Sequence, residues 1–117
     1  MIESSCVCGA VRLAISHAPD ELVDCNCSIC RRYAALWAYY PLKDVIVPGG
    51  LTDVFMLGPK KIEFHRCKLC GCVTHWSPVD KSRDRMGVNA RLMAPEILSQ
   101  VRVRHLDGAD PWKFLDE

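Results

Sequence analysis

The sequence lacks the features that mark exported, membrane-bound or nucleic-acid-binding chains. No basic segment followed by an apolar segment stands at the N-terminus, and no apolar run approaches the roughly 20 residues that span a membrane. The formal net charge is +1 and the isoelectric point is about 7.6, whereas domains that bind nucleic acid through bulk charge are strongly basic. We therefore expect a cytoplasmic protein with no membrane partner, and nucleic acid is not an expected partner.

Long helical patterns are also scarce, and 117 residues leave room for one hydrophobic core. Seven glycines and seven prolines divide the chain into short segments, several of which alternate apolar and polar residues as half-buried strands do. The predicted strands are residues 10–15, 36–40, 53–57, 62–66, 85–90 and 101–106, and short helical turns are predicted at 28–33 and 94–99. We expect a mainly β, antiparallel single domain over residues 1–117, and no pattern indicates an oligomeric state.

The residue that is over-represented is cysteine, with eight in a short chain. Such a count is typical of a secreted disulfide scaffold or of an intracellular metal protein. The cytoplasm keeps thiols reduced, and C-x-C pairs would be strained as disulfide bridges. The cysteines therefore favour bound metal over disulfides, and zinc is the metal that thiolate clusters of this kind most often hold. In a domain this small, a structural zinc would supply much of the stability.

The first and last cysteine clusters together predict a closed zinc site. Cys67-x-x-Cys70-Gly71 has the tight turn that brings two sulfurs to one metal, followed by a glycine that permits unusual backbone angles. Cys6-x-Cys8 places two thiolates on the same side of an extended segment. Four sulfurs from Cys6, Cys8, Cys67 and Cys70 would complete a tetrahedral structural zinc.

The middle cluster predicts a zinc site with an open position. Cys25, Cys27 and Cys30 supply three ligands within six residues, and Asp24 is the neighbouring acidic side chain that could add a fourth. A zinc with three protein ligands and one open position is typical of a catalytic site. The alternative is that Cys72 completes this site, giving two closed zinc sites without catalysis. Otherwise Cys72 is expected to be a small buried core residue.

The three clusters, in this order, resemble the glutathione-dependent formaldehyde-activating enzyme family, which carries the CENP-V/GFA domain. The resemblance rests on C-x-C-G-x-V at 6–11, C-x-C-x-x-C-R-R at 25–32 and C-x-x-C-G at 67–71. Trp76 after the last cysteine cluster and the D-G-x-x-x-W tail from Asp107 to Trp112 add to it. The family implies a small β-tent fold with two zinc ions, one structural and one catalytic, whose ligands match the two groups above.

The resemblance also implies a chemistry. In the family, the thiol of glutathione reaches the catalytic zinc while formaldehyde adds to the sulfur, giving S-(hydroxymethyl)glutathione. Cys25, Cys27 and Cys30 match the catalytic ligands, so the chain is expected to be a zinc-dependent carbon–sulfur lyase or thiol–aldehyde adduct-forming enzyme. Its partners would be a small-molecule thiol, glutathione or another, and an aldehyde. Departures from the family pattern are Cys72 in place of serine or threonine, Asn26 in place of histidine, and 33–35, which lacks a glycine.

Two further classes of function remain open at this point. One is a non-catalytic zinc module of the same fold that binds a protein or nucleic-acid partner. The other is a glutathione carrier that sequesters its ligand at the open zinc. An open second site favours the enzyme or the carrier, and a closed site with four cysteines favours the module, because it leaves no place for a substrate.

Several side chains near the middle cluster are weaker candidates. Arg31 and Arg32 could bind a substrate carboxylate through their fork geometry, or could compensate the charge of three thiolates. Trp37, Tyr39 and Tyr40 could line a pocket, although core packing is the more common role of an aromatic strand.

The histidine beside Trp76 is the last candidate. His75 could serve as a proton donor or a spare ligand, but we expect a partly exposed histidine without a metal role.

Overall fold

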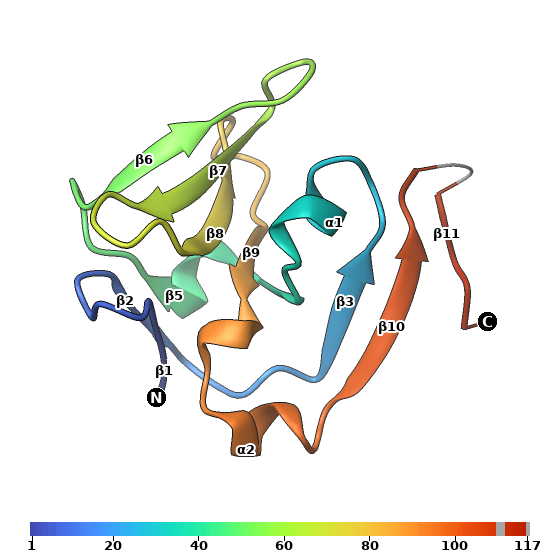
Figure 1. Cartoon of the computed structure of the whole chain (residues 1–117), viewed down its shortest axis with the longest axis horizontal. Coiled ribbons are helices and arrows are strands. Elements are labelled where there is room, and N and C mark those ends of the chain that lie inside the picture. The colour runs from blue at the N-terminus through green and yellow to red at the C-terminus, as the bar shows by residue number, and fades with distance from the viewer. Residues whose placement is uncertain (110–111, 117) are drawn as a thin grey trace.

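Two β-sheets make up the architecture of the computed structural model, which describes residues 1–109 and 112–116 (Figure 1). The smaller sheet has the order β1-β2-β5, formed by Ile2–Ser5, Arg12–Ile15 and Val45–Ile46. The larger has the order β11-β10-β3-β4-β9-β8-β7-β6. Its strands are β3 (Glu21–Cys25), β4 (Trp37–Tyr40), β6 (Thr52–Phe55), β7 (Ile62–Cys67), β8 (Val73–Pro78), β9 (Met86–Asn89), β10 (Arg102–Asp107) and β11 (Lys113–Phe114). The α-helices are α1 (Cys30–Tyr33) and α2 (Pro95–Leu98), and 3-10 turns stand at Leu42–Asp44 and Ala90–Leu92.

The mainly β prediction is confirmed, and each of the six predicted strands overlaps an observed one. Both helical turns also form, at α1 and α2. The sequence did not indicate β1, β3, β8 or the two-residue strands β5 and β11, because their residues do not alternate cleanly between apolar and polar. The antiparallel expectation fails at one pair, since β10 runs parallel to β3.

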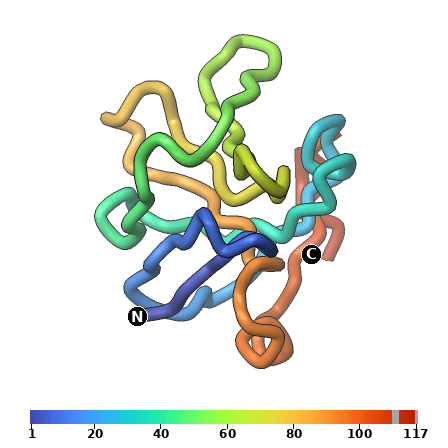
Figure 2. The backbone as a smooth tube through the Cα atoms, turned by 60° about the vertical axis from the view of Figure 1, so that its left-hand side comes forward, coloured from blue at the N-terminus to red at the C-terminus, as the bar shows by residue number. Residues whose placement is uncertain are grey.

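That parallel pair brings the C-terminal part of the chain to the middle cysteine cluster. Leu106 of β10 lies opposite Cys25 of β3, and the amide of Asn26 donates a hydrogen bond to the Leu106 carbonyl at 3.1 Å. Figures 1 and 2 both show the red C-terminal strand beside the blue-to-cyan segment that runs from β3 into α1. Residues far apart in sequence therefore meet at the end of β3.

The apolar core divides into two clusters because strand residues alternate between the two faces of the larger sheet. On β4, Ala38 and Tyr40 belong to the larger cluster, together with Val11, Leu13 and Ile15. Trp37 of the same strand belongs to the second cluster, which gathers around Cys25 and Cys30. The second cluster therefore lies beside the middle cysteines and forms the floor of the candidate site. No helix among the described residues is long and apolar enough to cross a membrane.

Candidate metal centres and the pocket beside them

Cys6, Cys8, Cys67 and Cys70 form one group, with their four sulfur atoms within 4.8 Å of one another. The turn between β1 and β2 supplies the first two, and the end of β7 with the turn that follows supplies the others. The Cys6–Cys8 and Cys8–Cys67 Sγ–Sγ distances are both 3.6 Å. Sulfurs bound tetrahedrally to zinc at about 2.3 Å lie about 3.8 Å apart. The group therefore fits a zinc ion.

The two turns that carry these cysteines are built alike. Gly9 and Gly71 both have a φ of 80°, a left-handed conformation that glycine adopts without steric cost, and each follows the second cysteine of its pair. Their amides donate to the carbonyls of Cys6 and Cys67, both at 3.0 Å. The backbone amide of Val11 also points at the Cys6 sulfur, at 3.3 Å. Such N–H donors stabilise the thiolate form of cysteine, and the thiolate is the form that binds zinc.

Cys72 lies beside this first group and not beside the middle cluster. It is half-buried, and its thiol interacts with that of Cys70. The amide of Cys72 lowers the pKa of Cys70 to about 6. The alternative in which Cys72 completes the middle site is therefore wrong, because the side chain lies at the other candidate metal centre. The expectation of a buried core residue holds in part, since the thiol is half-buried.

Cys25, Cys27 and Cys30 form the second group, again with their sulfurs within 4.8 Å of one another. Cys25 ends β3, Cys27 lies in the following loop and Cys30 begins α1. No His, Asp or Glu of residues 1–109 and 112–116 joins the group, and this includes Asp24. The donor set fits a zinc ion with three protein ligands and one position left for a small molecule.

Hydrogen-bond donors surround the three sulfurs. The indole N–H of Trp37 donates to the Cys30 sulfur at 3.3 Å, and the amide of Cys30 points at the Cys27 sulfur at 3.5 Å. The pKa of Cys25 falls to about 6, first because the Cys30 thiol donates to it, with smaller contributions from the amides of Cys27 and Gly108. The pKa of Cys30 is raised in turn by the neighbouring Cys25. The protein therefore favours a thiolate at this group before any metal adds its charge.

Gly108, after the end of β10, leaves the space that the second group needs. A Cβ atom at this position would lie 2.5 Å from the Cys25 sulfur and 3.0 Å from the ring of Trp112. The Asn26 side chain ties the same segment down, donating to Asp107 at 3.0 Å and accepting from the amide of Ala109 at 3.1 Å. Residues 107–109 and Trp112 of the tail motif thus lie beside the second cluster. Asp110 and Pro111, which complete the motif, lie outside the described residues.

We predict that Gly108→Ala lowers zinc affinity at the second group alone, by roughly 10- to 100-fold, because the added methyl displaces the Cys25 sulfur. Competition against a colorimetric chelator measures the affinity of each site. Gly49→Ala is the matched control, since a Cβ there meets nothing within 4 Å and the backbone is not left-handed. Equal zinc affinity in the two variants would contradict the prediction.

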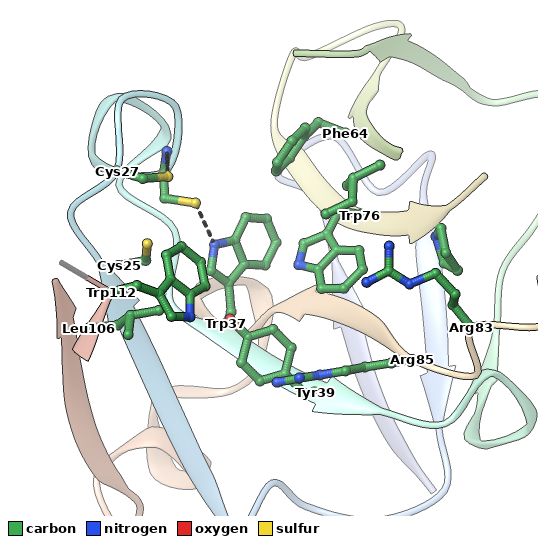
Figure 3. Close-up of a pocket in the computed structure, with 13 residues that line it drawn as sticks. Cys25, Cys27, Trp37, Tyr39, Phe64, Trp76, Arg83, Arg85, Leu106 and Trp112 are labelled. Carbon is green, nitrogen blue, oxygen red and sulfur yellow. Dashed lines mark hydrogen bonds between the residues drawn. The ribbon is translucent and has the colours of Figure 1, made fainter. Parts of the chain in front are cut away.

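A cavity of about 290 Å³ opens beside the three sulfurs (Figure 3). Most of its wall is aromatic or aliphatic, and two arginines complete it. The lining residues are Cys25, Cys27, Cys30, Trp37, Tyr39, Ile62, Phe64, Trp76, Pro78, Arg83, Arg85, Leu106 and Trp112. Clefts of this kind, mostly apolar with a few convergent polar groups, are the usual form of a small-molecule site.

The predicted arginine pair does not reach this cavity. Arg31 and Arg32 are exposed on α1 and are not part of the lining, and the Arg32 guanidinium donates to the Ser28 carbonyl at 2.6 Å. Arg83 and Arg85, from the loop between β8 and β9, are the arginines in the wall. Their contribution was not visible in the sequence, because it depends on how that loop folds back over the sheet.

The aromatic strand both packs and lines the cavity. Trp37 and Tyr39 face the cavity, whereas Tyr40 points to the opposite side and donates its hydroxyl to the His17 carbonyl at 3.1 Å. The sequence left pocket and core as alternatives for these residues. Because successive side chains of a strand point to opposite faces, Trp37 and Tyr39 line the pocket and Tyr40 packs in the core.

His75 is buried, with 1% of its surface exposed, so the expectation of a partly exposed histidine is wrong. Its ring stacks on His65 with the centroids 4.1 Å apart, and its Nδ1 lies 2.8 Å from the Thr74 hydroxyl. Burial lowers the pKa of His75 to about 3, so the ring is neutral near pH 7. Its ring nitrogens lie in neither group of candidate metal ligands among the described residues.

Comparison with known proteins agrees with this description. The family model described as "Glutathione-dependent formaldehyde-activating enzyme" matches residues 1–104. Among solved structures, the crystal structure of a Rhodobacter sphaeroides protein is similar, with 25% sequence identity and a TM-score of 0.71. The alignment covers 87% of this chain and 99% of that one. The resemblance predicted from the cysteine motifs is confirmed: the chain belongs to the glutathione-dependent formaldehyde-activating enzyme family.

Proposed function

We propose that this protein is a carbon–sulfur lyase that forms and cleaves adducts between a small thiol and an aldehyde in the cavity beside Cys25, Cys27 and Cys30. The observation that carries the proposal is a three-sulfur group with no fourth protein ligand in residues 1–109 and 112–116, open to a cavity of small-molecule size. Zinc held by these cysteines would supply a Lewis acid that lowers the pKa of a thiol brought to it. Glutathione and formaldehyde are the reference substrate pair of the family.

The reaction is a balanced addition without oxidation or reduction. The sulfur electron pair forms the new bond to the carbonyl carbon, and the carbon–oxygen π pair moves to the oxygen. The thiol loses one proton and the oxygen gains one, so no net proton is released or consumed. In reverse, the carbon–sulfur bond breaks, and the aldehyde and thiol are released.

Tyr39 is the side chain that we assign to the oxygen. It lines the cavity, and its hydroxyl makes no hydrogen bond to any group in the described part of the chain. Burial raises the pKa of Tyr39 and outweighs the nearby Arg85 charge, which lowers it, so the phenol keeps its proton at neutral pH. It can therefore donate a hydrogen bond to the oxygen on which negative charge develops.

Aromatic side chains give the inner part of the same space an apolar wall. Trp37 stands over the sulfurs, and Phe64 packs against it with a centroid separation of 6.2 Å. An apolar wall lowers the local dielectric constant, which strengthens hydrogen bonds and charge interactions beside it. The three thiolates also require a reducing compartment, which supports a cytoplasmic location.

We expect Tyr39→Phe to reduce turnover roughly 100-fold while zinc content stays unchanged, because one donor to the developing oxyanion is lost. Exchange-rate measurement by NMR with isotopically labelled formaldehyde and glutathione, or another thiol that binds, gives the rate above the spontaneous reaction. Tyr33→Phe is the control, since Tyr33 packs on Phe64 but is not part of the lining. A wild-type protein with full zinc and no rate enhancement with any thiol that binds would overturn the proposed function.

A glutathione carrier is the second candidate. It is favoured by the exposure of the cavity wall at Trp112, of which 66% is exposed, because a broad opening suits binding and release without a closed reaction space. The same exchange measurement separates the candidates, since a carrier binds the thiol without accelerating exchange.

A further inference from the structure

The cavity has two chemically different ends, and they indicate which thiol it takes, provided that the proposed function holds. Figure 3 shows the cysteine sulfurs on one side and Arg83 and Arg85 on the opposite side, with aromatic rings between them. A substrate whose sulfur meets the cysteines must therefore pass the aromatic rings before it reaches a positive charge.

The part of the cavity between the cysteines and the arginines has an apolar wall that suits an apolar group of the substrate. All three tryptophans of the chain, Trp37, Trp76 and Trp112, line the cavity, and Phe64 and Ile62 add to the wall. A Cβ at residue 87 would lie 2.0 Å from the indole nitrogen of Trp76, so a glycine there is what lets this ring lie across β9.

Such a wall does not suit a peptide backbone. Apart from the sulfurs, the polar side-chain groups in the wall are the Tyr39 hydroxyl, the indole N–H groups and the two guanidinium groups. Amide groups of a peptide buried against aromatic rings without partners each cost free energy. An aromatic or branched apolar skeleton meets the same surface without that cost.

The cationic end is available to a ligand. Neither Arg83 nor Arg85 makes an ion pair with a residue of 1–109 or 112–116, and the Arg85 guanidinium lies over the Tyr39 ring at 4.1 Å. The carboxylates of their own loop make their hydrogen bonds with other groups, although Asp80, whose pKa is lowered mainly by Ser82, lies near enough to Arg83 for the arginine to lower that pKa further. Asp80 accepts from the amide and hydroxyl of Ser82, and Asp84 accepts from the amide of Leu42 at 2.8 Å.

Positive charge continues outward from Arg83. A second cavity of about 260 Å³ shares this arginine and is lined by Lys60, Lys61, Val79 and Asp80 as well. Three cations and one carboxylate leave a net positive surface, which attracts an anionic group toward the outer end of the site.

We propose that the substrate is a thiol with an aromatic or otherwise apolar skeleton and one anionic group, a carboxylate or a phosphate, at the end remote from the sulfur. The apolar part lies between Trp37, Phe64 and Trp76, and the anionic group binds Arg83 and Arg85. The bond changes at sulfur are those given above.

Binding to the zinc-loaded protein tests this with matched probes. 4-(Mercaptomethyl)benzoate carries both the ring and the anion, benzyl mercaptan lacks the anion, 3-mercaptopropionate lacks the ring, and glutathione is the peptide thiol. Because every tryptophan lines the cavity, intrinsic fluorescence reports on it directly, and calorimetry provides a second readout. We expect 4-(mercaptomethyl)benzoate to bind about tenfold or more tightly than each of the others. Its phosphate analogue, 4-(mercaptomethyl)phenyl phosphate, distinguishes the two anions.

Variants assign the anion to its partners. Arg83→Gln and Arg85→Gln are expected to weaken binding of 4-(mercaptomethyl)benzoate by roughly 10- to 100-fold and to leave benzyl mercaptan unchanged. Arg66→Gln on β7 and Arg31→Gln on α1 are the controls, since both arginines are exposed and neither lines the cavity.

The outcomes separate this inference from the proposed function. Tighter binding of glutathione than of 4-(mercaptomethyl)benzoate, or equal losses for charged and uncharged probes in the Arg83→Gln variant, would overturn the inference and leave the lyase intact. Binding of no thiol by fully zinc-loaded protein would overturn the proposed function itself.

Discussion

A Cys27→Ser variant is expected to bind one zinc ion where the wild-type protein is expected to bind two, to retain its fold and to lose measurable acceleration of thiol–aldehyde exchange. Cys27 is half-buried and belongs to the second sulfur group, which the loop after β3 and the start of α1 carry. Serine removes the sulfur ligand, and the two remaining cysteines bind zinc too weakly to retain it against a chelator. Metal analysis on freshly purified protein gives the zinc content, and circular dichroism gives the fold.

The fold is expected to survive because the second group does not join distant strands by itself. Its sulfurs come from residues 25–30, while the contact with the C-terminal segment is made by the β3–β10 ladder and by the Asn26 side chain. Cys72→Ser is the matched control, since it removes a half-buried thiol that belongs to neither ligand group. One zinc ion in the wild-type protein, or two in the Cys27→Ser variant, would contradict the assignment of a separable second site.

The grouping of the cysteines could be predicted because most of it is local. Cys25, Cys27 and Cys30 lie within six residues, so a single loop and helical turn decides their geometry. The other group forms only when two separate turns meet. Each turn can be recognised in the sequence by the glycine after its second cysteine, and both glycines have a positive φ. Local backbone rules apply in both cases, and they can be read without the tertiary fold.

The walls of the cavity could not be predicted in the same way. Arg83 and Phe64 reach it from β-strands and loops whose neighbours are set by the strand order, and the sequence contains no signal for that order. The parallel pairing of β10 with β3 is the sharpest case, since it places Gly108 against Cys25 although 83 positions separate them. The burial of His75 could not be predicted either, because its neighbours in sequence are typical of a half-exposed strand. The ring is buried where it stacks on His65 across the β7–β8 pair.

The largest effect on stability is expected from Cys67→Ser. Cys67 is 1% exposed, ends β7 and packs within the larger apolar cluster. The amides of Leu69 and Cys70 point at its sulfur, at 3.4 and 3.5 Å, so a bound zinc would hold the β7–β8 turn through this residue. Losing the ligand separates that turn from the turn between β1 and β2. The unfolded chain has no preformed zinc site, so the free energy of zinc binding adds to the stability of the folded state. Without the ligand, the free energy of unfolding should fall by about 5 kcal/mol or more.

Thermal unfolding followed by circular dichroism checks this, with an expected decrease in Tm of about 20 °C. Cys72→Ser serves again as the control, because it removes a neighbouring thiol outside the ligand group and should change Tm by only a few degrees. A chelator added to the wild-type protein should reproduce the decrease, since it removes the metal without changing the core. A Cys67→Ser protein as stable as Cys72→Ser would mean that the apolar clusters hold the two sheets together without the metal, and that the first group is not a structural site.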